Sequence, residues 1–194
     1  YYVFTEKSHG DDRNNPTEDK TVYSEETTLV KYEPEVTTKA QDQVTELDEN
    51  GKGKIADNVS VRGGHPGDTV EIAVYQNGPT LDKPAEGEQS LDVLRADNEK
   101  REKEGMPTRE LPEKNNDSTV LPTQVHSVKL DENGNADFRT DDFEIDESGY
   151  YWFTYDLHST DMTEPKSETE VIHEETTFVK WRPFVETVAQ NQKL

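Results

Sequence analysis

The chain has 194 residues and no cysteine, which excludes disulfides and thiolate metal sites. Asp and Glu number 43 against 21 Lys and Arg, so the formal net charge is -22. Such a surface repels nucleic-acid phosphates and anionic lipid headgroups. No apolar run approaches the roughly 20 residues of a membrane-spanning helix. We therefore expect neither nucleic acid nor membrane insertion among the partners of this chain.

The first segment of the chain recurs near its end. Residues 1–45 align without gaps with residues 150–194 and share 20 identities. The best-matched runs are 1–5 with 150–154 and 25–31 with 174–180, both separated by 149 residues. Self-similarity at a fixed spacing is typical of tandem repeats. The sequence therefore predicts a repeat of 149 residues.

The equivalent prolines Pro34 and Pro183 predict the boundary between repeats, because proline lacks an N–H and interrupts strand pairing. The complete repeat would then span residues 34–181. Residues 1–33 would be the closing hairpin of a preceding repeat, and residues 182–194 the first strand of the next. A permuted unit of residues 1–149 with a trailing hairpin is the alternative. The expected partners are neighbouring repeats of the same chain, and we expect a monomer.

Alternating apolar and polar residues, with abundant Thr and aromatic side chains, predict strands along most of the chain. An Asp-Glu-Asn-Gly-Asn turn at residues 131–135 predicts a hairpin between the strands on either side of it. Strands separated by turns favour an all-β fold, specifically a β-sandwich with a long, partly irregular insertion. The expected strands are residues 36–40, 55–61, 69–75, 125–130, 136–138, 143–145, 150–157 and 170–181.

The insertion, residues 78–124, is rich in Pro, Asn and charged residues. Residues 90–104 could form a short surface helix, with Ser90 as its N-cap and Gly105 as its C-cap. Loops carry binding specificity more often than the strands that they connect. The insertion contains no aromatic residue, which argues against a recognition surface there.

Residues 147–153 resemble the F-strand pattern of immunoglobulin domains, acidic-Ser-Gly-x-Tyr-x-Cys. The resemblance implies an immunoglobulin-like sandwich in which Tyr151 is the corner tyrosine and Phe153 replaces the cysteine. A buried tyrosine ring requires a backbone acceptor for its hydroxyl.

The usual signatures of catalysis and metal binding are missing from the sequence. Residues 48–55 resemble part of a calcium loop, but Lys52 and Lys54 lie inside it and Val59 stands where a ligand glutamate belongs, which favours a turn. The five histidines lack metal-ligand spacing, and no nucleophile elbow or phosphate-binding loop is present. We therefore expect no metal site, no cofactor and no enzyme.

Five segments, residues 34–40, 55–61, 66–70, 149–153 and 173–179, together resemble immunoglobulin-like stalk repeats of Gram-positive cell-wall-anchored adhesins. The actinobacterial and clostridial members with Thr–Gln ester bonds are the most similar in style. The resemblance implies a spacer on the outside of a bacterial cell wall that projects a binding tip.

In ester-bond domains a first-strand Thr attacks a last-strand Gln, assisted by an acid and a His. The resemblance assigns these roles to Thr38, Asp57 as the second-strand acid and His173 as the late His. Residues 170–181 contain no Gln, and Glu175 stands near its expected position. Water would then leave in place of ammonia.

Other positions of the repeat bear on this assignment. Thr38 recurs as Thr187, whereas Thr37 is replaced by Glu186 and His173 aligns with Ser24. An isopeptide bond through Lys31 or Lys180, the lysines that recur, is the alternative cross-link.

Two other functions fit the sequence. The insertion, or the loop around His158, could bind a host protein or glycan, which adds a host-surface ligand to the expected partners. The chain could also be an accessory module of a secreted hydrolase whose catalytic domain lies elsewhere.

Overall fold

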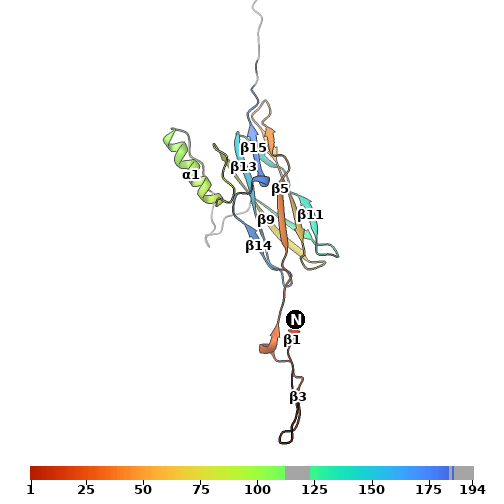
Figure 1. Ribbon diagram of the computed structural model, residues 1–194. Helices are drawn as coiled ribbons and strands as arrows, with labels where there is room; N and C mark the ends of the chain where they lie inside the picture. The colour runs from red at the N-terminus through yellow and green to blue at the C-terminus, as the bar shows by residue number, and fades with distance from the viewer. Residues whose placement is uncertain (112–122, 184, 186–194) are drawn as a thin grey trace, which may run out of the picture.

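A computed structural model of the protein describes residues 1–111, 123–183 and 185. The chain forms an elongated body from residues 34–181 and a slender N-terminal arm from residues 1–33 (Figure 1). The expected first strand of a following repeat, residues 182–194, lies almost entirely outside the described residues, as does Thr187.

Strands are the main secondary structure of the body, which is consistent with the predicted all-β class. One α-helix, α1 (Ser90–Lys103), is present among the residues that the structure describes, and none of the described helices is long and apolar enough to cross a membrane. The strands are β5 (Glu35–Ala40), β6 (Val44–Glu46), β7 (Gly53–Ile55), β8 (Asp57–Arg62), β9 (Thr69–Thr80), β10 (Gln124–Lys129), β11 (Ala136–Arg139), β12 (Phe143–Ile145), β13 (Gly149–Leu157), β14 (Lys166–Glu168) and β15 (Thr176–Lys180).

Two sheets enclose the core of the body. The larger has the order β10-β9-β13-β15-β6, with β14 also paired to β13, and the smaller has the order β11-β8-β5. A further pair joins β12 to β7. Alternate residues of β13, namely Tyr151, Phe153 and Tyr155, share the core with Val36 and Val59 of the smaller sheet. The period-two pattern of a strand places these side chains on one face.

Helix α1 covers the outer face of the larger sheet, where Trp152 is fully buried. The Trp152 Nε1–H donates to Ser90 Oγ at 2.7 Å. The prediction of Ser90 as the N-cap was therefore wrong: Gln89 is the N-cap, without a side-chain cap, and Ser90 begins the helix. The Ser90 hydroxyl accepts this hydrogen bond from the sheet because the buried indole N–H of Trp152 needs an acceptor.

The predicted hairpin between residues 125–130 and 136–138 was wrong. The turn forms, with the Asp131 N–H donating to the Asn135 carbonyl at 2.8 Å. The strands on either side of it nevertheless separate, because β10 pairs with β9 and β11 pairs with β8. A turn sequence determines local chain reversal, whereas burial of each strand's apolar face determines its partner.

Other strand boundaries differ from the predictions. The expected strand over residues 170–181 is interrupted by a 3-10 turn, η2 (His173–Glu175), and the expected strand over residues 55–61 is split between β7 and β8. Strand β9 continues to Thr80, and the short strands β6 and β14 were not predicted.

The arm repeats the pairing of the closing strands of the body. It contains β1 (Tyr2–Val3), β2 (Glu6–Ser8), β3 (Thr17–Asp19), η1 (Ser24–Glu26) and β4 (Thr27–Thr28). Tyr2 pairs with Thr28 in the arm, and Tyr151 pairs with Thr177 in the body. The β2–β3 register likewise equals the β13–β14 register 149 residues later.

The apolar residues of the arm are exposed, although their equivalents in the body are buried. Tyr2 is 63% exposed and Val22 is 65% exposed, whereas Tyr151 and Val171 at the equivalent positions are 2% and 0% exposed. The arm therefore has the pairing of a closing hairpin without the sheet that would cover it.

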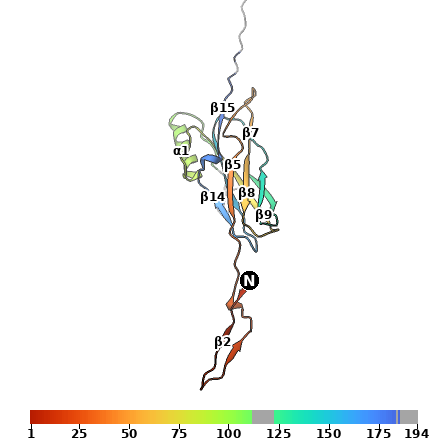
Figure 2. The same ribbon diagram turned by 45° about the vertical axis from the view of Figure 1, so that its right-hand side comes forward.

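The chain enters and leaves the body at opposite ends. The arm joins the body where β5 begins, and β15 ends at the far pole, as two views show (Figures 1 and 2). Force applied along the chain would therefore act on β5 and β15.

Candidate cross-link site

Three polar side chains meet inside the body: Thr38 from β5, Asp57 from β8 and Glu175 from η2. All three are buried, with exposed fractions of 8%, 0% and 3%. The Thr38 hydroxyl donates a hydrogen bond to Glu175 Oε1 across 137 residues of sequence. The cluster thus joins the first strand of the body to the turn immediately before its last strand.

Strand register explains how Thr38 and Asp57 come together. In the β5–β8 pair Thr38 lies opposite Val59, and Ala40 lies opposite Asp57. Residues directly opposite share a face, so Thr38 and Asp57 are diagonal neighbours, at a typical separation of about 7–8 Å. Both therefore face the core, as the burial pattern of each strand indicates.

The Asp57 backbone is clamped by Thr140. The Asp57 N–H donates to Thr140 Oγ1, and the Thr140 N–H donates to the Asp57 carbonyl, both at 2.9 Å. Among the described residues, neither carboxylate oxygen of Asp57 has a hydrogen-bond partner of ordinary geometry. Burial raises the pKa of Asp57 to about 7, and the nearby backbone amides of Asn58 and Lys39 offset only part of that effect.

Glu175 is held in a similar environment. Burial raises the pKa of Glu175 to about 8, the hydrogen bond from Thr38 opposes this shift, and the negative charges of Asp57, Glu168 and Glu86 add to it. Its Oε2 has no partner within the described part of the chain. Both carboxyl groups therefore titrate near neutral pH, where one of them can be ionised while the other is protonated.

This arrangement supplies the parts of an acyl transfer. Thr38 provides a nucleophilic oxygen, which is weak unless a neighbouring base accepts its proton. A carboxylate with a pKa near the working pH is a suitable base. A protonated carboxyl is a far better acyl donor than a carboxylate, because no neighbouring negative charge reduces the electrophilicity of its carbonyl carbon.

His173 lies outside this cluster. Its Nε2 is 3.1 Å from the Pro84 carbonyl, and its Nδ1 is 3.3 Å from the Glu86 carboxylate. The histidine that the family resemblance implies is therefore directed toward the insertion, away from Thr38. Tyr155 lies near the cluster, and its hydroxyl donates to the backbone carbonyl of Val36, two residues before Thr38, at 3.1 Å.

Tyr155 was not singled out from the sequence. The signal was present, because Tyr151, Phe153 and Tyr155 alternate on one face of a predicted strand. Burial raises the pKa of Tyr155 to about 12, with Glu175 contributing to the shift, so its hydroxyl stays protonated and polar.

The two recurring lysines have other roles. Lys31 Nζ donates to the Thr160 carbonyl at 2.9 Å, and Lys180 Nζ lies 6.0 Å from the centre of the Phe178 ring. Within residues 1–111 and 123–183, neither lysine makes a hydrogen bond or an ion pair with an Asn or Asp side chain. The isopeptide alternative therefore has no pair of side chains in contact.

The calcium-like segment forms a turn closed by its own aspartate. Asp48 Oδ1 accepts hydrogen bonds from the backbone amides of Asn50 and Lys52, at 2.8 and 2.9 Å. No group of three or more His, Asp or Glu residues suited to a metal ion occurs among the described residues.

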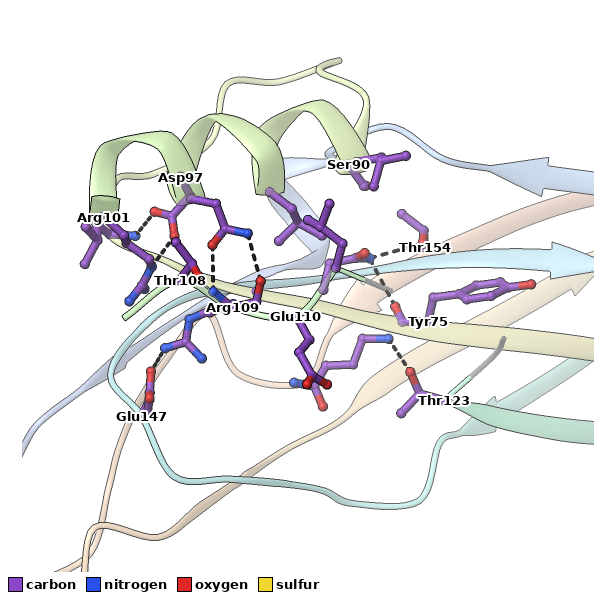
Figure 3. Close-up of a pocket in the computed structure, with 18 of the residues that line it drawn as sticks. Tyr75, Ser90, Asp97, Arg101, Thr108, Arg109, Glu110, Thr123, Glu147 and Thr154 are labelled. Atoms are coloured by element: carbon purple, nitrogen blue, oxygen red, sulfur yellow. Dashed lines mark hydrogen bonds and ion pairs between the residues drawn. The ribbon is translucent and has the colours of Figure 1, made fainter. Parts of the chain in front are cut away.

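A groove of about 980 Å³ lies between α1 and the outer face of the larger sheet. Leu91, Leu94 and Met106 supply apolar lining, and the pairs Asp97–Arg101 and Glu147–Arg109 lie at one end (Figure 3). Asn98 of α1 holds the backbone of Arg109 against the helix. Its side-chain amide donates to the Arg109 carbonyl and accepts from the Arg109 N–H, both at 2.8 Å. This groove is where the binding-module alternative would have its ligand.

Comparison of the chain with protein-family models, curated proteins and solved structures found no match.

Proposed function

We propose that the chain is a structural spacer repeat of a bacterial cell-surface adhesin, built as an immunoglobulin-like sandwich and closed by a Thr38–Glu175 ester. The observation that carries the proposal is the position of the buried cluster. Thr38 lies on the first strand of the body, and Glu175 lies directly before the last, at the strands that would bear force.

Several features support a repeated spacer. The arm has the strand register of the closing hairpin 149 residues later, and Glu26 stands at the position equivalent to Glu175. The Tyr151 hydroxyl donates to the Glu147 carbonyl at 2.9 Å, the hydrogen bond expected of a corner tyrosine. These observations also favour residues 34–181 over the permuted unit.

The proposed reaction is a condensation. Thr38 Oγ1 attacks Cδ of protonated Glu175, and Asp57 accepts the hydroxyl proton. As the Cδ–OH bond breaks, Asp57 returns that proton to the departing hydroxyl, which leaves as water. The products are one ester, one water and an unchanged Asp57.

Bulk water favours hydrolysis of an ester, so the reaction needs a strong local advantage. Groups held in reactive geometry attain effective molarities of about 10⁵–10⁸ M, which lowers the barrier to ester formation. Burial of all three side chains also excludes the water that would reverse the reaction. The ester is therefore expected to form and persist in the folded protein.

Intact mass measurement tests the proposal. We expect the purified chain to weigh one water less than its sequence requires, and the Thr38→Val variant to have the full mass. Thr37→Val is the matched control, because Thr37 is the next residue on the same strand but faces solvent, and it should keep the loss. Glu175→Gln should form the same ester with loss of ammonia.

Peptide mapping completes the test. A digest should contain one branched peptide joining the segments of Thr38 and Glu175. A full mass in the parent chain, from folded protein, would overturn the ester. A loss that persists in Thr38→Val would assign the cross-link to another pair.

A further inference from the structure

The last residues of the arm are fastened to the body by backbone and side chain. The Tyr32 N–H donates to the Met162 carbonyl, and the Tyr32 carbonyl accepts from the Glu164 N–H, both at 2.8 Å. The Tyr32 ring meets His65 edge-on, with ring centres 5.2 Å apart and planes at 74°. This approach is a favourable aromatic geometry.

The loops that receive Tyr32 are internally braced. Asp68 Oδ2 accepts from the hydroxyls of Thr160 and Thr163, at 2.6 and 2.8 Å. Burial would raise the pKa of Asp68, but these hydrogen bonds and nearby His65 outweigh it and lower the pKa, so the carboxylate stays ionised. We call residues 63–68 and 158–164 the receiving surface.

A second aromatic residue stands at the opposite pole. The Trp181 ring packs on Gly51, where an added Cβ would lie 2.9 Å from Trp181 Cη2. Gly51 has φ +73°, a conformation that favours glycine. Trp181 is still 59% exposed, so the turn of residues 48–53, the exit turn, covers only part of the ring.

Tyr32 and Trp181 occupy the same position of the 149-residue repeat, directly after the recurring Lys31 and Lys180. At one pole of the body, Trp181 packs on the exit turn of its own repeat. At the other pole, the equivalent residue Tyr32 packs on the receiving surface. The two contacts use different neighbours, Gly51 for Trp181 and His65 for Tyr32.

We infer that each joint between successive repeats is built on one shared aromatic residue. Trp181 would lie between the exit turn of its own repeat and the receiving surface of the following repeat. Lys180 would reach the carbonyl equivalent to that of Thr160, as Lys31 does. The partner is therefore a second copy of this repeat, and the inference rests on the proposed function.

The inferred joint is stiff. A flexible linker would leave its backbone solvated, whereas Tyr32 is held by two backbone hydrogen bonds and Lys31 by a third. A chain of such repeats would keep a defined angle from one copy to the next, which suits a spacer that projects a distal tip.

The test uses this chain extended by one period, with residues 1–182 followed by residues 34–181. Two versions are compared. In one, the terminal Trp181→Phe change leaves Trp181 only at the internal joint; in the other, the internal Trp181→Phe change leaves Trp181 only at the end. Trp152 is fully buried and contributes equally to both. Acrylamide is the quencher, because the negative protein would repel iodide.

We expect the internal Trp181 to be quenched several-fold less than the terminal one and to emit at shorter wavelength. A His65→Ala change in the second copy should raise quenching of the internal residue alone. Equal quenching at both positions would overturn the shared joint. The intact mass of the same proteins separates the two ideas: loss of two waters with equal quenching would leave the cross-linked spacer standing and reject only the joint.

Discussion

At the scale of single residues, the site depends on the buried carboxyl groups of Asp57 and Glu175. The ionised form of each would be more stable in water than in the core. An unpaired buried charge is costly, so a carboxyl in this position takes up a proton instead. The pKa values of about 7 for Asp57 and about 8 for Glu175 follow from that cost. Strongly perturbed groups at a shared site are a common mark of chemistry.

These pKa values predict the pH dependence of ester formation. Asp57 accepts the Thr38 proton only when ionised, so the rate should fall below about pH 7. Glu175 accepts the attack only when protonated, so the rate should fall above about pH 8. We expect a bell-shaped profile with its maximum between these values, measured by mass spectrometry as chain whose ester has first been hydrolysed in alkaline denaturant refolds at each pH.

Two variants check that assignment. Asp57→Asn removes the base and should slow formation by about 10²–10⁴-fold. Glu175→Gln removes the requirement for a protonated carboxyl and should abolish the alkaline fall. A profile that stays flat from pH 5 to 9 in the parent chain would contradict these roles.

At the scale of elements, α1 packs on the sheet through polar contacts. Its buried residues are Ser90, Asp97 and Arg101, which is unusual for a helix that covers a sheet. Ser90 accepts the indole N–H of Trp152, and Asp97 accepts the Leu81 N–H at 2.8 Å. The insertion is therefore attached by specific hydrogen bonds and little apolar area.

Replacement of Ser90 should loosen this attachment. Ser90→Ala leaves the buried Trp152 N–H without its acceptor, which costs about 1–3 kcal/mol. Denaturant unfolding should report that loss, and amide hydrogen exchange should show faster exchange in residues 90–103 than in the core strands. Ser127→Ala, at an exposed serine of β10, is the control. Unchanged stability in Ser90→Ala would show that the hydrogen bond contributes nothing.

At the scale of the whole molecule, the positions of β5, β15 and the cluster determine how the body would bear force. Force enters through β5 and leaves through β15. The proposed ester between Thr38 and Glu175 would carry that force directly and bypass the 137-residue separation between them. Without the bond, the body would resist force only through strand pairing and packing.

Single-molecule stretching can measure this difference. An extended residue spans at most about 3.3–3.6 Å, so release of the bypassed segment adds roughly 450 Å. We expect Thr38→Val to show that lengthening and the parent chain to show none below the force that breaks covalent bonds. Thr37→Val should behave as the parent. Full lengthening of the parent chain would contradict a cross-link between first and last strands.

Several features of the fold could be predicted from the amino-acid sequence because they are local or repeated along the chain. The 149-residue period, the closing hairpin and the alternation along β5, β9 and β13 need no knowledge of distant contacts. Thr38 and Asp57 could also be proposed as site residues, since each lies in a predicted strand at a position that faces the core.

Tertiary structure decided what depends on residues far apart in the chain. It brought Glu175 to Thr38, turned His173 toward the insertion, placed Tyr155 near the cluster and engaged Ser90 with Trp152. It also separated β10 from β11. The physical reason is the same in each case: pairing partner and burial are set by the sum of long-range packing, which a local pattern of side chains does not contain.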